Sequence, residues 1–313
     1  MVERDSLGID IKYEAESVSG YKVVRPGEYV IHLRSFQGGF AFSDKTGICS
    51  PAYTILHPKE VLSYGFLKEY FMSQKFIDSL RLVTYGIRDG KSIFVEEWMK
   101  LKTYIPKSHK EQERIKEFLG LIDKRLTIQN KVIERYRSLI RAITQKCFQD
   151  EYEYSQILLS EIAPNIAAGK SKPSAGPYPL YGSTGIIGTC SSDAYKGEMI
   201  LVARVGSIGQ IQLINTKGCG ITDNTLIVNA GKLNRYVYFF LKTFNFQKIT
   251  SGTTQPLITG GNLKRISVPI LPATKRGLFV SLLDAIERRI DLEQKVLQYY
   301  SASKSYVLAN MFI

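Results

Sequence analysis

Hydrophobic and polar positions alternate with two different periods in the first part of the chain. Residues 20–56 contain short strand-like runs, such as 29–33, separated by turn residues. A helical stretch is predicted over 64–82, and a second strand-like stretch ends at 104–106. A long helical period then begins near Ser108, a plausible cap with an acidic residue three positions later. The pattern predicts a mixed domain followed by a long helix.

The second part of the chain repeats this order. Strands are predicted over 199–228, a helix over about 235–246, further strands around 266–271, and a closing helix from about Thr274. Each half is therefore expected to be an α+β domain with a helical tail.

The residues themselves also repeat. The segment 26–34 reads again at 196–204, an offset of 170 that also relates Cys49 to Cys219. In the helices, 122–126 is echoed by 286–290 at an offset of 164. A period this long indicates a duplicated domain, because solenoid repeats have periods of about 20–50 residues.

The two helices carry a heptad pattern that predicts an antiparallel coiled coil. The predicted a positions are Ile115, Ile122, Gln129, Tyr136 and Ile143 in the first helix and Phe279, Ile286, Glu293, Tyr300 and Val307 in the second. The predicted d positions are Phe118, Arg125, Val132 and Leu139, with Leu282, Arg289, Val296 and Ser303.

A polar notch interrupts the middle of this seam and predicts its register. Pairing residues whose numbers sum to 418 sets Arg125 against Glu293 and Gln129 against Arg289. A buried polar layer that satisfies itself in one alignment can specify that alignment. The alternative is two amphipathic helices that each pack on their own domain.

Composition adds a partner class. The chain has 313 residues and a formal net charge of +13, an excess typical of proteins with a polyanionic partner, although such charge can also serve only solubility. Its four cysteines and three histidines show neither a zinc-ligand spacing nor a disulfide framework. Without a signal-peptide pattern or a long apolar run, the chain is expected to be cytoplasmic, with no metal and no cofactor.

Two further segments point to a family. The stretch 251–258, leading through 263–269 into the closing helix, and the stretch Pro106–Ile115, which introduces the central helix with Glu111-Gln112, resemble the specificity (S) subunit of Type I restriction-modification systems. The resemblance covers nearly the whole chain. It is the combination of domain, helix, domain and helix that makes it specific.

The resemblance implies a domain plan and a set of partners. Residues 1–107 and 150–273 would be two target recognition domains that each read half of a bipartite double-stranded DNA site. Residues 108–149 and 274–313 would be spacer helices on which two methyltransferase subunits dock, with restriction subunits joining outside them. The first domain lacks a counterpart of the segment 157–188, so it is expected to be incomplete at its N-terminus and its half-site degenerate.

Residues that could contact DNA lie in predicted turns, where side chains can reach phosphates and base edges. In the second domain they are Lys170, Lys172, Arg204, Lys217, Asn224, Thr253, Thr254 and Gln255, and in the first domain Arg34, Gln37, Arg81, Arg88 and Lys91. Arg204 is the leading candidate because Arg34 repeats it at the end of the same strand. A structural salt bridge or strand-end charge is the alternative for Arg204, and a turn residue bonding its own backbone is the alternative for Gln255.

Enzymatic signatures are missing from the sequence. It contains no GxxxxGK[ST] phosphate loop, no dinucleotide fingerprint, no amino-methyltransferase motif and no evident nuclease carboxylate pair or hydrolytic triad. The chain is therefore predicted to be a non-catalytic DNA-recognition subunit. The alternatives are a truncated scaffold that binds a methyltransferase without full DNA reading and, further off, an enzyme of unfamiliar type.

Overall fold

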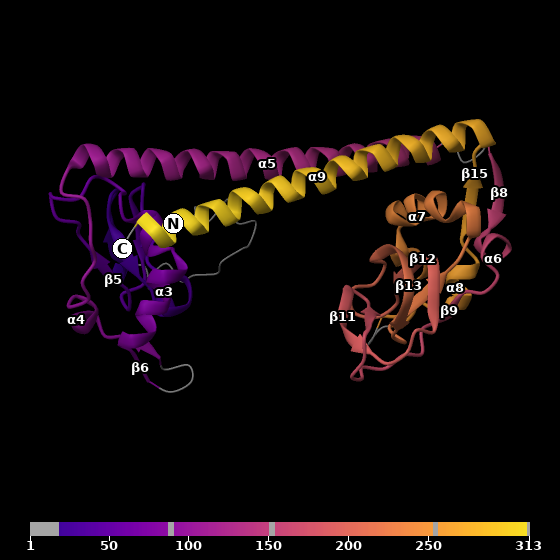
Figure 1. The fold of residues 1–313 in the computed structure, drawn as a ribbon, viewed down its shortest axis with the longest axis horizontal. Coiled ribbons are helices and arrows are strands. Elements are labelled where there is room, and N and C mark those ends of the chain that lie inside the picture. Colours follow the sequence, from indigo (N-terminus) through magenta and orange to yellow (C-terminus); the bar gives the residue numbers. More distant parts are fainter. Residues whose placement is uncertain (1–18, 87–90, 150–153, 253–255, 312–313) are drawn as a thin grey trace. The chain divides into compact units, whose positions relative to one another are not determined.

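Two compact units make up the protein. The computed structural model describes residues 19–86, 91–149, 154–252 and 256–311. Unit 1 comprises residues 1–132 with 293–313, and unit 2 comprises 133–292. Two long helices, α5 (His109–Gln149) and α9 (Ala273–Met311), contribute a part to each unit (Figure 1). Each unit therefore contains one mixed domain together with segments of both helices.

The domain of unit 1 is built from short strands. Its main sheet has the order β3-β2-β5, and β1 pairs separately with β4 and β6 with β7, all antiparallel. The strand bounds are β1 Lys22–Val24, β2 Tyr29–Ile31, β3 Ala41–Phe42, β4 Gly47–Cys49, β5 Thr54–Leu56, β6 Thr84–Tyr85 and β7 Ser92–Ile93. The helices of the domain are α1 Ser35–Gly38, α2 Lys68–Phe71, α3 Gln74–Leu80, the 3-10 turn η3 Arg81–Val83 and α4 Val95–Trp98.

An aromatic cluster forms the core of unit 1. Phe40 is fully buried, with its ring centroid 4.8–5.2 Å from those of Phe71, Phe76 and Trp98. Tyr29 also lies in this core, where its hydroxyl accepts a hydrogen bond from the Leu67 amide at 3.2 Å. Burial raises the pKa of Tyr29 to about 12. Aromatic packing thus compensates for strands of only two or three residues.

The helix predicted over 64–82 is divided into α2 and α3. Between them the Ser73 hydroxyl accepts a hydrogen bond from the Phe76 amide and so caps α3. A serine at this position favours a new helix start over continuation, because its side chain satisfies an amide that has no partner inside the helix.

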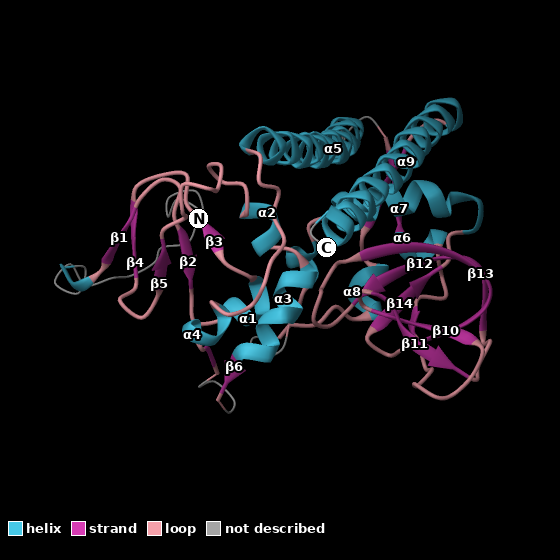
Figure 2. Cartoon of the chain, turned by 60° about the vertical axis from the view of Figure 1, so that its left-hand side comes forward, coloured by secondary structure: helices cyan, strands magenta, loops and turns pink. Residues whose placement is uncertain are grey.

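The domain of unit 2 is a strongly curved sheet with the order β11-β10-β13-β12-β14-β9. Its longest strand, β13, bends along its length (Figure 2). Backbone amides of Gly169 and Ser171 donate to the carbonyl oxygens of Thr225 and Ile221, which joins the β9 end of the sheet to β13. The bounds are β8 Ser155–Leu158, β9 Ala167–Ala168, β10 Tyr178–Gly182, β11 Gly185–Cys190, β12 Tyr195–Ala203, β13 Ile211–Ile221, β14 Thr225–Val228 and β15 Ser267–Ile270, where β15 pairs with β8.

Helical elements cover and connect this sheet. They are α6 Leu159–Ile162, the 3-10 turn η5 Gly231–Leu233, α7 Asn234–Thr243, the 3-10 turn η6 Phe246–Ile249 and α8 Gly260–Lys264. One face of the sheet holds an apolar cluster that includes Met199, Leu201 and Ile221. Phe239 on α7 is fully buried as well.

The same three-strand arrangement occurs in both units. β2 lies between β3 and β5, and β12 lies between β13 and β14, with all pairs antiparallel. Cys49 pairs with Lys22 on β1, and its repeat counterpart Cys219 pairs with Tyr195 at the start of β12. The duplication read from the sequence is therefore a duplication of fold. The predicted fold class is confirmed.

Polar contacts in unit 1 hold the start of α5 and the last part of α9. In unit 1, the fully buried Gln112 donates to the carbonyl oxygens of Val61 and Pro106 at 2.9 and 2.8 Å and accepts from the Ser63 amide at 2.7 Å. Lys304 on α9 binds Glu69 of α2 and Asp123 of α5 at 2.5 and 2.6 Å. The glutamine of the motif at the start of the central helix therefore has a structural role.

The predicted a positions border the helix seam, but the predicted d positions are wrong. Phe118, Leu139, Leu282 and Val296 are exposed, whereas the residue four positions after an a position is buried at Leu119, Ile133, Ile140, Leu283 and Ile290. Three predicted a positions of α9, Phe279, Ile286 and Glu293, are also buried. Each helix has a second apolar stripe outside the seam, and the heptad assignment combined the two stripes.

The predicted register is also wrong, by one helical turn. Glu293 does not pair as expected with Arg125, which is exposed; its partner is Gln129, whose Nε2 donates to the Glu293 carbonyl oxygen at 3.0 Å and to its carboxylate. The expected pairing of Gln129 with Arg289 is replaced by this contact. The direction is antiparallel as predicted, since Gln129 meets Glu293 while Asp123 meets Lys304.

Candidate nucleic-acid interface

Three loops of unit 2 meet at one end of its curved sheet. They are the β10–β11 turn, the loop after β12 and the turn between β13 and β14. Ser183 Oγ donates a hydrogen bond shared between the carbonyl oxygens of Val205 and Asn224, each 3.2 Å away. The Arg204 amide donates to the same Asn224 carbonyl at 3.0 Å. Ser183, which sequence reasoning did not select, therefore links the loops that carry Arg204 and Asn224.

Arg204 has an unusual environment in this cluster. Its side chain is half-buried, and it makes no ion pair with any residue in the described ranges. Its Nε is buried without a hydrogen-bond partner there, as are the hydroxyls of Thr222 and Thr225 beside it. A buried donor without a partner costs about 1–3 kcal/mol, so such groups are usually kept for a function. These contacts do not support a structural salt bridge as the role of Arg204.

The other predicted residues of this domain fall into four groups. Lys170 and Lys172 are exposed on the segment whose Ser171 amide bonds to Ile221, next to the loop cluster. Asn224 is exposed within the cluster. Lys217 is not brought to it, because its neighbour Thr216 pairs with Gly197 near the opposite end of β12. Thr253, Thr254 and Gln255 lie outside the described residues.

In unit 1 the structure brings three predicted residues together. Gln37 from α1, Arg81 from η3 and Lys91 next to β7 line one cavity of about 480 Å³, with Phe36 and Thr84. Arg81 also lies 3.4 Å from Asp78, in a pair exposed enough to contribute little to stability.

The remaining predicted residues of unit 1 are Arg34 and Arg88. Arg34 is exposed at the start of α1 and does not line the cavity. Its amide donates to Nδ1 of His32, whose pKa is lowered by burial. Arg88 lies outside the described residues.

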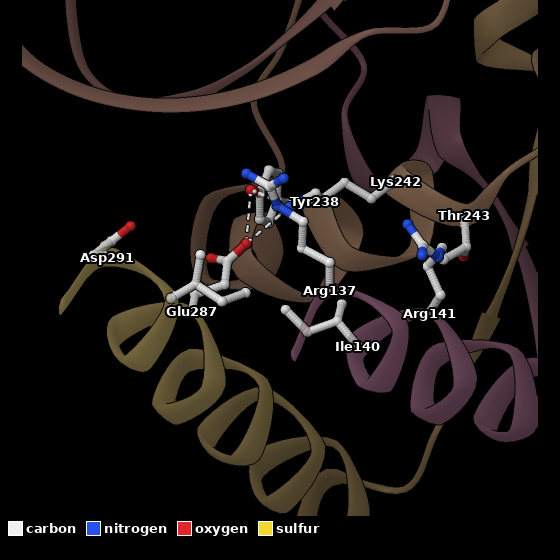
Figure 3. A pocket seen from close by; sticks show the side chains of 9 residues that line it. Arg137, Ile140, Arg141, Tyr238, Lys242, Thr243, Glu287 and Asp291 are labelled. Atoms are coloured by element: carbon white, nitrogen blue, oxygen red, sulfur yellow. Dashed lines mark hydrogen bonds and ion pairs between the residues drawn. The ribbon is translucent and has the colours of Figure 1, made fainter. Parts of the chain in front are cut away.

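A second kind of cavity lies where the long helices meet the domain of unit 2. Arg137 and Arg141 from α5 project toward Tyr238 and Lys242 of α7 around a space of about 460 Å³ (Figure 3). Glu287 on α9 accepts from Tyr238 and Lys242, both at 2.9 Å. These contacts couple the domain to the helices.

A neighbouring ion pair strengthens this junction. Nε of Arg235 on α7 donates to Asp284 on α9 at 2.7 Å, and its Nη2 lies 3.0 Å from Glu287. Burial lowers the pKa of the Arg235 guanidinium, but the hydrogen bonds and charges of Asp284 and Glu287 outweigh burial and raise it overall. These ion pairs and hydrogen bonds form a network that fixes α7 on α9.

The structure offers little for other chemistry. In the described ranges no group of three or more His, Cys, Asp or Glu side chains could hold a metal ion. The four cysteines are free thiols. None of the helices that the structure describes combines the length and apolarity that crossing a membrane needs.

Comparison with known proteins identifies the family. The family described as Type I restriction modification DNA specificity domain matches residues 141–299, just over half of the chain. A proposed type I restriction enzyme specificity subunit of Haemophilus influenzae is 29% identical over 139 residues, a match that covers 41% of this chain and 36% of that relative. The matched part is thus about a third of the relative's length.

Solved structures have the same fold. The Type I restriction-modification S subunit of M. genitalium superimposes with a TM-score of 0.59 at 19% identity, covering 93% of this chain and 84% of that one. A chain from a study of complex assembly and conformational transition of the type I R-M system gives 0.57 at 14% identity, covering 92% and 82%. The chain belongs to the family of Type I restriction-modification DNA specificity subunits, as the resemblance in its sequence predicted.

Proposed function

We propose that this protein is the non-catalytic subunit that selects the DNA sequence for a Type I restriction-modification complex. In this proposal each mixed domain reads one half of a bipartite double-stranded site, and partner subunits supply methylation and cleavage. The protein needs no cofactor of its own, and it acts in the cytoplasm, where it has access to DNA. The observation that carries the proposal is the duplicated fold, in which each copy presents cationic and amide side chains from loops.

The outer faces of the long helices support docking of two methyltransferase subunits. Apolar side chains outside the seam are exposed on both helices: Phe118, Leu121 and Ile128 on α5, and Leu282, Leu292 and Tyr299 on α9. Positions related by the 164-residue repeat have nearly equal exposure: 47% at Phe118 and 50% at Leu282, then 53% at Ile128 and 54% at Leu292. Exposed apolar stripes of this kind mark interaction surfaces.

Repetition of the stripe has a consequence for stoichiometry. Because the exposed apolar pair Phe118 and Ile128 of α5 recurs as Leu282 and Leu292 of α9, one type of partner can bind twice in equivalent ways. We therefore propose two methyltransferase subunits for each copy of this chain, with restriction subunits binding to that assembly.

The scaffold alternative is less well supported by the first domain. A scaffold that no longer reads DNA has no need for a polar cavity, yet Gln37, Arg81 and Lys91 converge on one that no acidic side chain of the described residues lines. We therefore propose that the first domain also contacts DNA.

Co-purification tests this function. The chain is co-expressed with a Type I methyltransferase subunit from the same genome, and the complex is titrated with genomic DNA fragments. We expect a stable complex that binds DNA and transfers methyl groups, whereas the chain alone transfers none. A complex that forms but neither binds nor methylates DNA would favour the scaffold.

A further inference from the structure

A cavity in unit 2 repeats the cavity of unit 1 that holds Gln37, Arg81 and Lys91. It measures about 990 Å³ and is lined by the glycine-flanked turn 206–209, by η6 with the residues next to it, and by Gly252 and Pro256. Its lining residues are Gly206, Ser207, Ile208, Gly209, Phe244, Asn245, Phe246, Gln247, Thr250, Gly252 and Pro256. Sequence reasoning selected none of these residues.

The two cavities are built from corresponding parts. One wall follows the corresponding strands β2 and β12, after which Gln37 and Ser207 are related by the 170-residue repeat. A second wall is the 3-10 turn after the domain helices, η3 in unit 1 and η6 in unit 2. A third comes from an antiparallel pairing that follows this turn, β6 with β7 in unit 1 and Ser251 with Leu257 in unit 2.

The walls of the unit 2 cavity are packed firmly against each other. Phe246 is buried, and a Cβ added to Gly209, which has φ +76°, would lie 2.6 Å from the Phe246 ring. The loop can approach the turn this closely because residue 209 is glycine. Asn245 Oδ1 accepts a hydrogen bond from the backbone amide of Gln247 at 3.0 Å, and the Asn262 side chain donates to the Ile249 carbonyl oxygen at 2.9 Å.

Two side chains remain available on this fixed turn. Gln247 and Lys248 are exposed, and neither side chain forms a hydrogen bond or ion pair with a described residue. Among the described residues that line this cavity and its unit 1 counterpart none is acidic, whereas acidic side chains line three cavities between a long helix and a domain. The turn is fixed in place, and it presents the Gln247 side-chain amide and the Lys248 ammonium group to solvent. These two groups can bind a base edge and a phosphate of a nucleic acid.

We propose that η6 carries the DNA contacts of the second domain that correspond to Arg81 in the first. Gln247 reads a base edge. Its side-chain amide suits adenine, because adenine presents one donor and one acceptor in the major groove and the amide can bind both. Lys248 binds a neighbouring phosphate. The inference rests on the proposed DNA-reading function and names residues that determine its specificity.

The test compares three variants in the complex with the methyltransferase: Gln247→Ala, Lys248→Ala and the control Lys232→Ala. Lys232 is an exposed lysine on η5 that lines neither of the two cavities. The nearby Asn234 side chain donates to the carbonyl oxygen of Glu198, in the middle of β12. Each complex is titrated with a labelled duplex carrying the wild-type methylation motif and with a scrambled duplex, over a series of salt concentrations. Thermal melting confirms that each variant is folded.

The two contacts predict different results. Lys248→Ala weakens binding of both duplexes by roughly three- to tenfold and reduces the slope of log affinity against log salt by about 0.9. Gln247→Ala weakens only the motif duplex, by roughly tenfold, and relaxes one position of the methylation motif. Lys232→Ala changes neither value.

Two other outcomes overturn the inference in distinguishable ways. If the wild-type complex prefers its motif and both η6 variants keep that preference, affinity and salt slope, then η6 does not contact DNA although the proposed function stands. If the wild-type complex shows no preference between the duplexes, the proposed function fails and the inference fails with it.

Discussion

Gln129 on α5 donates a hydrogen bond to the carbonyl oxygen of Glu293 on α9 at 3.0 Å and a second one to its carboxylate. Glu293 is buried, so this contact is a polar layer within an otherwise apolar helix seam. Replacing both partners of a buried polar layer by apolar residues can raise stability at the expense of a unique alignment, whereas removing one partner is costly. The contact therefore helps to fix the alignment of the two helices.

Gln129→Ala is expected to lower the free energy of unfolding by about 1.5–3 kcal/mol, because a buried carboxylate loses a hydrogen-bond donor. Chemical denaturation of the full chain measures the change. Gln145→Ala is the matched control, since Gln145 is an exposed glutamine on the same helix, and its effect should stay within about 0.5 kcal/mol. Equal effects of the two substitutions would show that the polar layer contributes no stability.

Arg204→Ala is expected to weaken DNA binding by the assembled complex by about 1–3 kcal/mol if the guanidinium makes a bidentate contact to a base. Arg204→Lys should recover little of this loss, because an ammonium group lacks the planar fork of donors. Equilibrium titration with the motif duplex measures both variants. Unchanged affinity together with an unchanged methylation motif would return Arg204 to a structural role.

Several of these features could be predicted from the sequence, because they depend on local pattern. The repeat and the starts of α5 and α9 depend on periodicity. Residue types in turns suggested Gln37, Arg81 and Lys91 as candidate DNA contacts, but they suggested Arg34 and Arg88 equally and did not predict that the first three share a cavity. The break between α2 and α3 was not predicted. It depends on one hydrogen bond of the Ser73 side chain, whereas the hydrophobic pattern over 64–82 is that of one continuous helix.

Other features depend on tertiary contacts that no local pattern encodes. The helix register could not be predicted, because an outward apolar stripe such as Phe118 and Leu282 has the same period as the seam. The buried Nε of Arg204 results from the meeting of three loops that are distant in sequence. Gln247 was not selected, because η3 and η6 begin 165 residues apart and the repeat of 170 residues therefore does not align them.

The apolar stripes predict how the complex assembles. Phe118→Asp and Leu282→Asp should each remove one methyltransferase subunit, because each places a charge on one of two equivalent apolar surfaces. The double variant should bind neither subunit. Light scattering of the purified complexes measures the stoichiometry.

Met99→Asp is the control for these variants, since Met99 is an exposed apolar residue at the end of α4 and does not belong to either long helix. It should leave the stoichiometry unchanged. If Phe118→Asp and Leu282→Asp also keep the full complement of methyltransferase subunits, the stripes are not the docking surface.

The central claim is that two related but different domains each read part of one DNA site. The loops that carry Arg204 in unit 2 and Gln37 in unit 1 differ in sequence, so the two half-sites should differ as well. The domains are joined through α5, a helix of 41 residues, so an unread spacer should separate the half-sites. Mapping methylated adenines across the genome of a strain that carries this chain with its methyltransferase tests this directly. We predict one asymmetric motif of two short half-sites around a spacer of fixed length; a continuous motif, or a palindrome with two equally strong halves, would contradict the account.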